Sequence, residues 1–132
     1  AAAAALFSNA GGIYYQRGNP EAARAHFAAA VELRPDYAEA LVNLALVLSE
    51  DMRSYSQALV HARRAVALRP EHPKSHHLLG NILQSLGHEP EAHLRFKTAE
   101  ALAAGQLANA PRGLYQWRAT RVGERQPAGL GP

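Results

Sequence analysis

One stretch of the sequence occurs twice, and it constrains the fold more than any other feature. The residues AVELRPDYAEALVNLA, from Ala30 to Ala45, return 35 residues later as AVALRPEHPKSHHLLG, from Ala65 to Gly80. Each copy reads as the end of one helix, an Arg-Pro stop and the start of a new amphipathic helix. A joint that recurs at such a period is typical of arrays in which helix pairs stack on their neighbours. The sequence therefore predicts an all-α solenoid.

Breaker and cap residues divide the chain into three pairs of expected helices. The first pair covers residues 6–17 and 20–34. In the second pair, the helices start after Asp36 and after Ser54. In the third pair, the first helix starts near Pro73 and the second covers 89–104. Gly18 is expected to close the first helix and Asn19 to cap the second. Asp36 with Glu39, and Ser54 with Gln57, have the spacing of capping boxes. Gly105 is expected to end the sixth helix, and the turn from Ser49 to Arg53 is one residue longer than the others and lacks glycine.

Small and large residues recur at matched positions of these helices. The small set is Gly11/Ala45/Gly80, Ala23/Ala58/Ala92 and Ala30/Ala65/Ala99, and the large set is Phe7/Leu41, Tyr14/Leu48/Leu83 and Phe27/Phe96, with Pro35/Pro70 between the pairs. This pattern resembles the tetratricopeptide repeat (TPR) family. The resemblance implies an α-solenoid of three helix-turn-helix repeats, at about residues 4–37, 38–72 and 73–105, within a domain of residues 1–105. His76 and Ala62 depart from the pattern, since large apolar or aromatic residues are usual there.

The end of the chain differs from the repeats. Residues 106–122 are expected to form a capping or docking helix, and residues 123–132 a flexible tail. The ten Lys/Arg residues of the first 103 are balanced by ten Asp/Glu, so the net charge of +3 comes from four arginines and one glutamate beyond them. As a cap the helix would cover the last repeat through Trp117. As a docking arm it would engage an acidic partner through Trp117, Arg118 and Arg121.

Composition and motifs exclude several classes of function. The chain has no cysteine, and His72 and His76 are separated by a proline that breaks metal-ligand spacing, so no metal site is expected. No nucleophile elbow or glycine-rich phosphate loop is present, and we expect neither a catalytic residue nor a cofactor. The balanced charge of the repeats argues against nucleic acid as a partner, and no apolar run is long enough for a membrane span. Without a readable secretory signal, the cytoplasm is the default compartment.

What remains is a binding surface. In TPR arrays the first helix of each pair lines the concave face, and the resemblance therefore implies peptide-binding residues Asn9, Tyr15, Gln16, Asn43, Leu46, Lys74, His77, Leu78 and Asn81. Asn9 and Asn43 occupy equivalent positions, which resembles the asparagine ladder of O-GlcNAc-transferase-like arrays, and Leu78 interrupts it. An asparagine can donate to and accept from a peptide backbone. Only Asn43 and Lys74 match the family's dicarboxylate clamp, which argues against a chaperone C-terminus as the partner.

These features predict a non-enzymatic scaffold that binds an extended peptide or a partner subunit in its concave groove. Two alternatives remain open. Because the sequence starts with alanine and not with methionine, the chain is also read as the substrate-recruiting TPR region of a larger enzyme. A third reading is a structural subunit of a large multiprotein complex, in which the convex face and the tail also make contacts.

Overall fold

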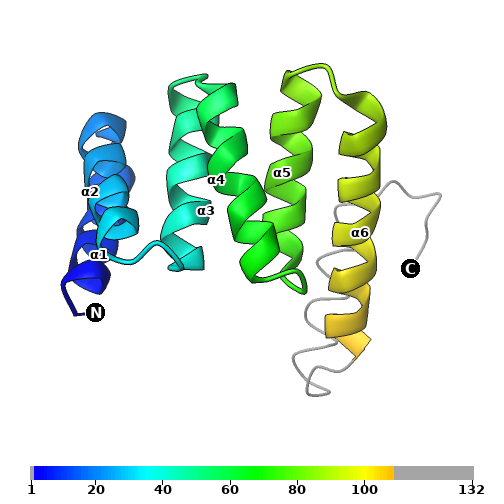
Figure 1. Cartoon of the computed structure of the whole chain (residues 1–132), viewed down its shortest axis with the longest axis horizontal. Helices are drawn as coiled ribbons and strands as arrows, with labels where there is room; N and C mark the ends of the chain where they lie inside the picture. The colour runs from blue at the N-terminus through cyan, green and yellow to red at the C-terminus, as the bar shows by residue number, and fades with distance from the viewer. Residues whose placement is uncertain (1, 109–132) are drawn as a thin grey trace.

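The computed structural model describes residues 2–108 and shows an all-helical array in that range. Figure 1 shows the helices side by side, running from α1 and α2 at one end to α6 at the other. The elements are α1 (Ala2–Gln16), α2 (Pro20–Leu33), α3 (Ala38–Leu46), the π-helical turn η1 (Val47–Asp51), α4 (Tyr55–Leu68), α5 (Pro73–Ser85) and α6 (Glu89–Ala108). The predicted all-α solenoid of helix pairs is confirmed. Among residues 2–108, none of the helices combines the length and the hydropathy needed to cross a membrane.

Each helix packs on its partner within a pair, and successive pairs stack through α2 on α3 and α4 on α5. One continuous hydrophobic core runs through the array, and its largest fully buried apolar side chains are Leu41, Val47, Leu79, Ile82 and Leu83. Alanines buried on α2 and α4 let the helices approach closely enough for these larger side chains to fill the remaining space. The hydrophobic side chains alternate in size across the facing helices, as the sequence pattern predicts.

Glycine and phenylalanine form a matched pair in two of the three repeats. A Cβ atom added at Gly11 would lie 2.7 Å from the ring of Phe27, and one added at Gly80 would lie 2.7 Å from the ring of Phe96. In the second repeat the equivalent positions hold Ala45 and Ala62, which are both buried. The absence of an aromatic ring at Ala62 is therefore compensated, because it leaves room for the methyl group of Ala45 on the facing helix.

The first and third repeats close their turns in the same way. Gly18 and Gly87 have φ angles of 77° and 84°, in the left-handed region that glycine adopts without steric cost. The next N–H in each turn reaches back five residues along the chain. Asn19 N donates to the Tyr14 carbonyl at 3.0 Å, and His88 N donates to the Leu83 carbonyl at 2.8 Å.

The second turn contains the extra residue that the sequence indicates. The equivalent closing bond spans six residues, because Ser54 N donates to the Leu48 carbonyl at 2.7 Å. The chain accommodates the extra residue by widening the end of α3 into the π-helical turn η1, where Met52 N donates to the Val47 carbonyl at 3.2 Å. Arg53 then takes the place of the glycine, with a φ angle of 54°. It is the one residue other than glycine with a positive φ angle in the part of the chain that the structure describes.

Some of the predicted helix boundaries and caps are confirmed and others are wrong, among them the start of the first helix, since α1 begins at Ala2 and not at residue 6. The Asn19 side chain caps α2, accepting a hydrogen bond from Ala22 N at 3.2 Å. Neither Asp36 nor Ser54 makes the predicted side-chain cap: α3 begins after Tyr37, and the side chain of Ser54 turns back toward the Met52 carbonyl. The predicted end at Gly105 is also wrong, because α6 continues to Ala108. A single glycine costs a helix only about 1 kcal/mol, which a long α6 tolerates.

The two cap residues provide a matched test of this difference. Asn19→Ala is expected to lower the free energy of unfolding by about 0.5–2 kcal/mol, since it removes a cap hydrogen bond. Ser54→Ala should change it by much less, because Ser54 occupies the same position without bonding the helix N-terminus. Urea denaturation of both variants measures the difference. Equal losses would contradict the cap assignment.

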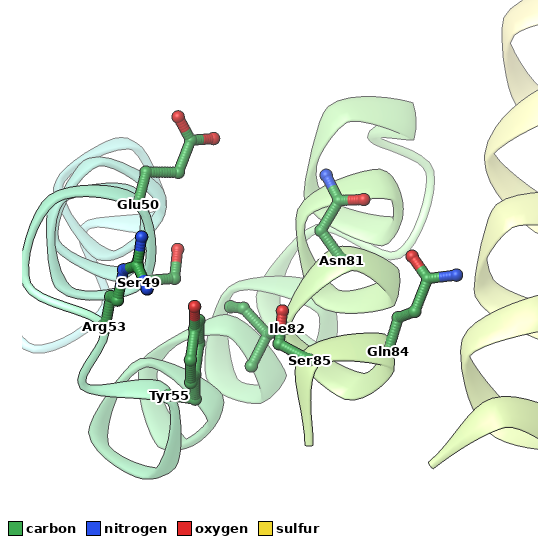
Figure 2. A pocket seen from close by; sticks show the side chains of 8 residues that line it. All are labelled: Ser49, Glu50, Arg53, Tyr55, Asn81, Ile82, Gln84 and Ser85. Carbon is green, nitrogen blue, oxygen red and sulfur yellow. The ribbon is translucent and has the colours of Figure 1, made fainter. Parts of the chain in front are cut away.

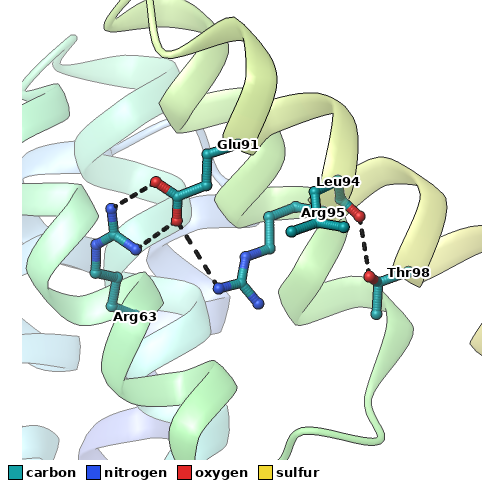
Figure 3. Close-up of polar contacts among 5 residues, drawn as sticks. All are labelled: Arg63, Glu91, Leu94, Arg95 and Thr98. Atoms are coloured by element: carbon teal, nitrogen blue, oxygen red, sulfur yellow. Dashed lines mark hydrogen bonds and ion pairs between the residues drawn. The ribbon is translucent and has the colours of Figure 1, made fainter.

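Charged residues link the second helices of the last two repeats across the surface. Both terminal nitrogens of Arg63 on α4 donate to the carboxylate of Glu91 on α6, at 2.7 and 3.1 Å. Arg95, one turn along α6, lies 3.8 Å from the same carboxylate, and Figure 3 shows the three side chains together. The hydrogen bond from Arg63 lowers the pKa of Glu91. Because the pair is solvent-exposed, it adds little to stability, and its bidentate geometry joins α4 to α6 in one relative orientation of the two side chains.

Candidate peptide-binding face

A pocket lies where the first helices of the second and third repeats end. It encloses about 560 Å³ and is lined by Ser49, Glu50, Arg53, Tyr55, Asn81, Ile82, Gln84 and Ser85. We call it the Arg53 pocket. Figure 2 shows Glu50, Arg53 and Tyr55 on one side and the amide side chains of Asn81 and Gln84 on the other. Its lining offers one cation, one anion, two amides and three hydroxyls, a mixture suited to hydrogen bonding with polar groups.

A second pocket lies at the opposite ends of the same two helices. It encloses about 170 Å³ and is lined by Ala38, Glu39, Val42, Asn43, Arg69, His72, Lys74 and Ser75. We call it the Lys74 pocket. The loop between α4 and α5 contributes Arg69 and His72, and α3 contributes Glu39 and Asn43. The two pockets therefore draw on α3, with its η1 extension, and on α5.

Helical spacing places both pockets along one surface, which we call the α3–α5 face. Along α3 and η1, residue 39, the pair 42/43, residue 46 and the pair 49/50 follow one another at steps of three or four, and residues 74, 78, 81 and 85 have the same spacing along α5. Leu46 and Leu78 fall between the pockets. Leu46 is partly buried against the core, and Leu78 is only 6% exposed. The face thus has an apolar middle between two polar ends.

The asparagines of this face are displaced by one helical turn between repeats. By register, Asn43 on α3 is equivalent to Leu78 on α5, and Leu46 is equivalent to Asn81. The predicted ladder of asparagines stops at Leu78 in strict register. One turn further along α5, Asn81 supplies the third-repeat amide, and it does so in the other pocket.

Charged groups lie at both ends of the α3–α5 face. Burial lowers the pKa of His72, and the nearby charges of Arg69 and Lys74 lower it further. His72 Nδ1 is hydrogen-bonded to Ser75 Oγ at 2.8 Å. Arg69 and Lys74 share the Lys74 pocket with Glu39, and Arg69 Nε also lies 3.7 Å from Glu71 Oε2 beside it, so the charges at this end balance. In the Arg53 pocket, Arg53 and Glu50 balance.

The remaining predicted groove residues are distributed more widely. Asn9 and Gln16 are exposed on α1 and line neither of the two pockets. Tyr15 packs against the core, and burial together with the carboxylates of Asp51 and Glu50 raises its pKa. The ring of His77 lies 5.4 Å from that of Phe96, so it packs toward α6. The candidate docking residues Trp117, Arg118 and Arg121 lie outside the described residues, as do most of residues 106–122 and all of the 123–132 tail.

Sequence reasoning missed the loop residues that complete both pockets. Arg53, Tyr55, Arg69 and His72 belong to turns or to the start of a second helix, so a rule that admits only first helices overlooks them. One signal was available for the Arg53 pocket: the turn is a residue longer and has arginine where the others have glycine. Among residues 2–108, no cluster of three potential metal ligands occurs.

Comparison with known proteins identifies the architecture. A family model described as "Tetratricopeptide repeat" matches residues 2–71, more than half of the chain. The chain belongs to the TPR family. No curated protein matches its sequence closely enough to count as a relative.

Solved TPR structures share the fold at low sequence identity. The second TPR domain of Spaghetti (RPAP3), solved with the HSP90 peptide SRMEEVD, superposes with a TM-score of 0.72 at 21% identity, covering 76% of this chain and 92% of that one. The first TPR domain of the same protein gives a TM-score of 0.72 at 19% identity, covering 76% and 79%. MamA gives a TM-score of 0.72 at 21% identity, covering 79% of this chain and 60% of its own. At these identities the likeness establishes the fold alone.

Proposed function

We propose that this TPR domain is a non-enzymatic interaction module that holds an extended peptide segment of a partner protein on the α3–α5 face. The observation that carries the proposal is the pair of pockets at the two ends of one face, each containing an asparagine amide. The structure of the related RPAP3 domain with a bound peptide supports a peptide ligand for a fold of this kind.

The dimensions of the face set the length of the bound segment. Glu39 and Glu50 are eleven positions apart, which corresponds to about 16 Å along a helix. An extended chain advances about 3.3 Å per residue, so about five peptide residues bridge the two pockets. Asn43 and Asn81 bond the peptide backbone near its two ends, and an apolar side chain of the peptide covers Leu46 between them. The ammonium group of Lys74 favours an acidic group at that end.

A peptide library displayed on phage tests this function, with seven-residue random segments as the probe. Peptides selected on the native chain are expected to bind the Asn43→Ala/Asn81→Ala variant at least five times more weakly. Each lost hydrogen bond is worth about 0.5–1.5 kcal/mol, and about 1.4 kcal/mol is a tenfold change in affinity. Fluorescence anisotropy with labelled peptides measures the dissociation constants.

Gln57 provides the control, because it is exposed on α4 and lines neither pocket. Gln57→Ala should bind the selected peptides as tightly as the native chain does. Circular dichroism of each variant shows whether the helices are intact. Unchanged affinity in the double asparagine variant would place the binding surface elsewhere.

A further inference from the structure

The helix α1 exposes a row of large apolar side chains. Leu6 is 68% exposed, Phe7 38%, Ile13 51% and Tyr14 36%. The two adjacent pairs are seven residues apart, so all four lie along one side of α1, which we call the α1 face. The whole helix, AAAALFSNAGGIYYQ, contains no charged residue. Contiguous apolar surface of this kind is uncommon on a free domain and marks an interaction site.

The repeat register shows what kind of surface the α1 face is. Its four residues are equivalent to Ala40, Leu41, Val47 and Leu48 in the second repeat and to Ser75, His76, Ile82 and Leu83 in the third. All eight of these equivalents are at most 4% exposed. In the second repeat α2 packs on this side, and in the third repeat α4 does. The α1 face thus continues the series of the α2–α3 and α4–α5 interfaces, and no helix among residues 2–108 takes the corresponding place on it.

The other end of the array has different chemistry. Val31 on α2 and Val66 on α4 pack against the core, and the equivalent residue of α6 is the exposed Glu100. At the position of Leu59 on α4, α6 has the exposed His93 and α2 has the exposed Arg24, so the difference between α6 and the covering helices lies at Glu100. A second copy stacked end to end would therefore place polar residues of its α6 on an apolar α1 face. Burying a charge there without a partner is costly, which argues against this occupant.

The helices that cover the equivalent faces define the chemistry of a helix that would fit the α1 face. The buried side of α4 has Leu59, Ala62 and Val66 at helical spacing. On α2, Val31 is at the position of Val66 and Phe27 is at that of Ala62. The exposed Arg24 is at the position of Leu59, so α4 is the fully apolar example. We propose that the α1 face binds an amphipathic helix of a partner protein, whose contact stripe consists of alanine and aliphatic residues without charge. The helix lies on α1 as α4 lies on α5. This site is distinct from the α3–α5 face and takes a helix instead of an extended peptide.

The chain provides its own probe for this surface. Residues 54–72 comprise α4 and the loop that leads into Pro73, and Ala4 is the register equivalent of Pro73. A graft of residues 54–72 placed directly before Ala4, in the otherwise full chain, presents a helix of the proposed type at a high effective concentration. We expect the melting temperature to rise by at least about 5 °C, the shift that about 1 kcal/mol produces in a domain of this size.

A matched graft separates specific docking from the mere addition of a helix. In it, the copies of Leu59, Ala62 and Val66 are replaced by serine, and the melting temperature should then stay near that of the native chain. Ile13→Ser should remove the gain from the unaltered graft while leaving the ungrafted chain as stable as before, because Ile13 is exposed there. The absence of a gain with the unaltered graft would overturn the proposal, and so would an equal gain with the serine graft. Sedimentation equilibrium of the native chain adds a further test: a dimer abolished by Ile13→Glu would show that a second copy, and not a partner helix, covers the face.

Discussion

Gly80→Ala is expected to lower the free energy of unfolding by about 1–3 kcal/mol, which is the usual cost of overpacking a core. The added Cβ would lie 2.7 Å from Phe96 Cε1 and 2.8 Å from Phe96 Cδ1. The Phe96 ring also packs against the His77 ring, so its movement disturbs both helices of the pair. Alanine has a higher helix propensity than glycine by about 1 kcal/mol, and this gain offsets only part of the clash. Urea denaturation followed by circular dichroism measures the change.

Gly12 is the control for the propensity effect. A Cβ at Gly12 meets no atom within 4 Å, so Gly12→Ala should stabilise the fold, by about 0.5–1 kcal/mol. A second control combines Gly80→Ala with Phe96→Ala, which recreates the alanine pair of the second repeat. Its loss should be smaller than the sum of the two single losses by at least about 0.5 kcal/mol, as expected for residues in contact. Additive losses would show that Gly80 and Phe96 do not constrain each other.

The fold was predictable because its signals are local and repeated. The recurrence of Arg-Pro at residues 34–35 and 69–70 and the alternation of small and large residues both depend on spacing along the chain. The use of an alanine pair, Ala45 and Ala62, in the second repeat where the third has Gly80 and Phe96 was not predictable in the same way. It requires knowing which residues of two helices meet, and the sequence alone makes Ala62 appear as a defect.

Helix caps were only partly predictable, for a physical reason. Asn19 is followed directly by Pro20, which fixes the backbone at the first position of α2 and leaves one arrangement for the cap. Ser54 has a similar backbone conformation, with φ −89° and ψ 67° against −115° and 79° at Asn19, but its hydroxyl donates to the Met52 carbonyl instead. A capping-box motif specifies residue types, whereas the cap itself depends on which backbone group the side chain bonds.

The candidate site was predictable on the helices and not in the loops. Asn43, Lys74 and Asn81 lie in the pockets because the first helices of the second and third repeats face each other. Arg53 and Arg69 reach the same pockets from turns, whose direction depends on how the repeats stack. Residues such as Leu78 and His77 satisfy the spacing rule, yet Leu78 is buried and His77 packs on Phe96. Helical periodicity identifies a face but does not determine which of its side chains a neighbouring helix covers.

Arg53→Gly is expected to raise the free energy of unfolding by about 1 kcal/mol. A residue with a Cβ pays about 1–2 kcal/mol for the left-handed conformation, and Arg53 has a φ angle of 54°. The equivalent turns of the first and third repeats avoid this cost with Gly18 and Gly87. The greater freedom of glycine in the unfolded chain reduces the gain, which is why the expected value lies at the lower end of the range. Thermal and urea denaturation both measure it.

Arg53→Ala separates the backbone from the guanidinium group. Alanine keeps the Cβ and therefore the strain, so this variant should be about as stable as the native chain while losing the charge of the Arg53 pocket. Both variants should weaken the binding of peptides selected on the α3–α5 face, since Arg53 lines the pocket in which Asn81 lies. Stabilisation by glycine together with weakened binding by both variants would show that the turn retains a strained arginine for its side chain. Equal stability of the glycine and alanine variants would show that the left-handed backbone at residue 53 carries no cost, and unchanged binding would remove Arg53 from the site.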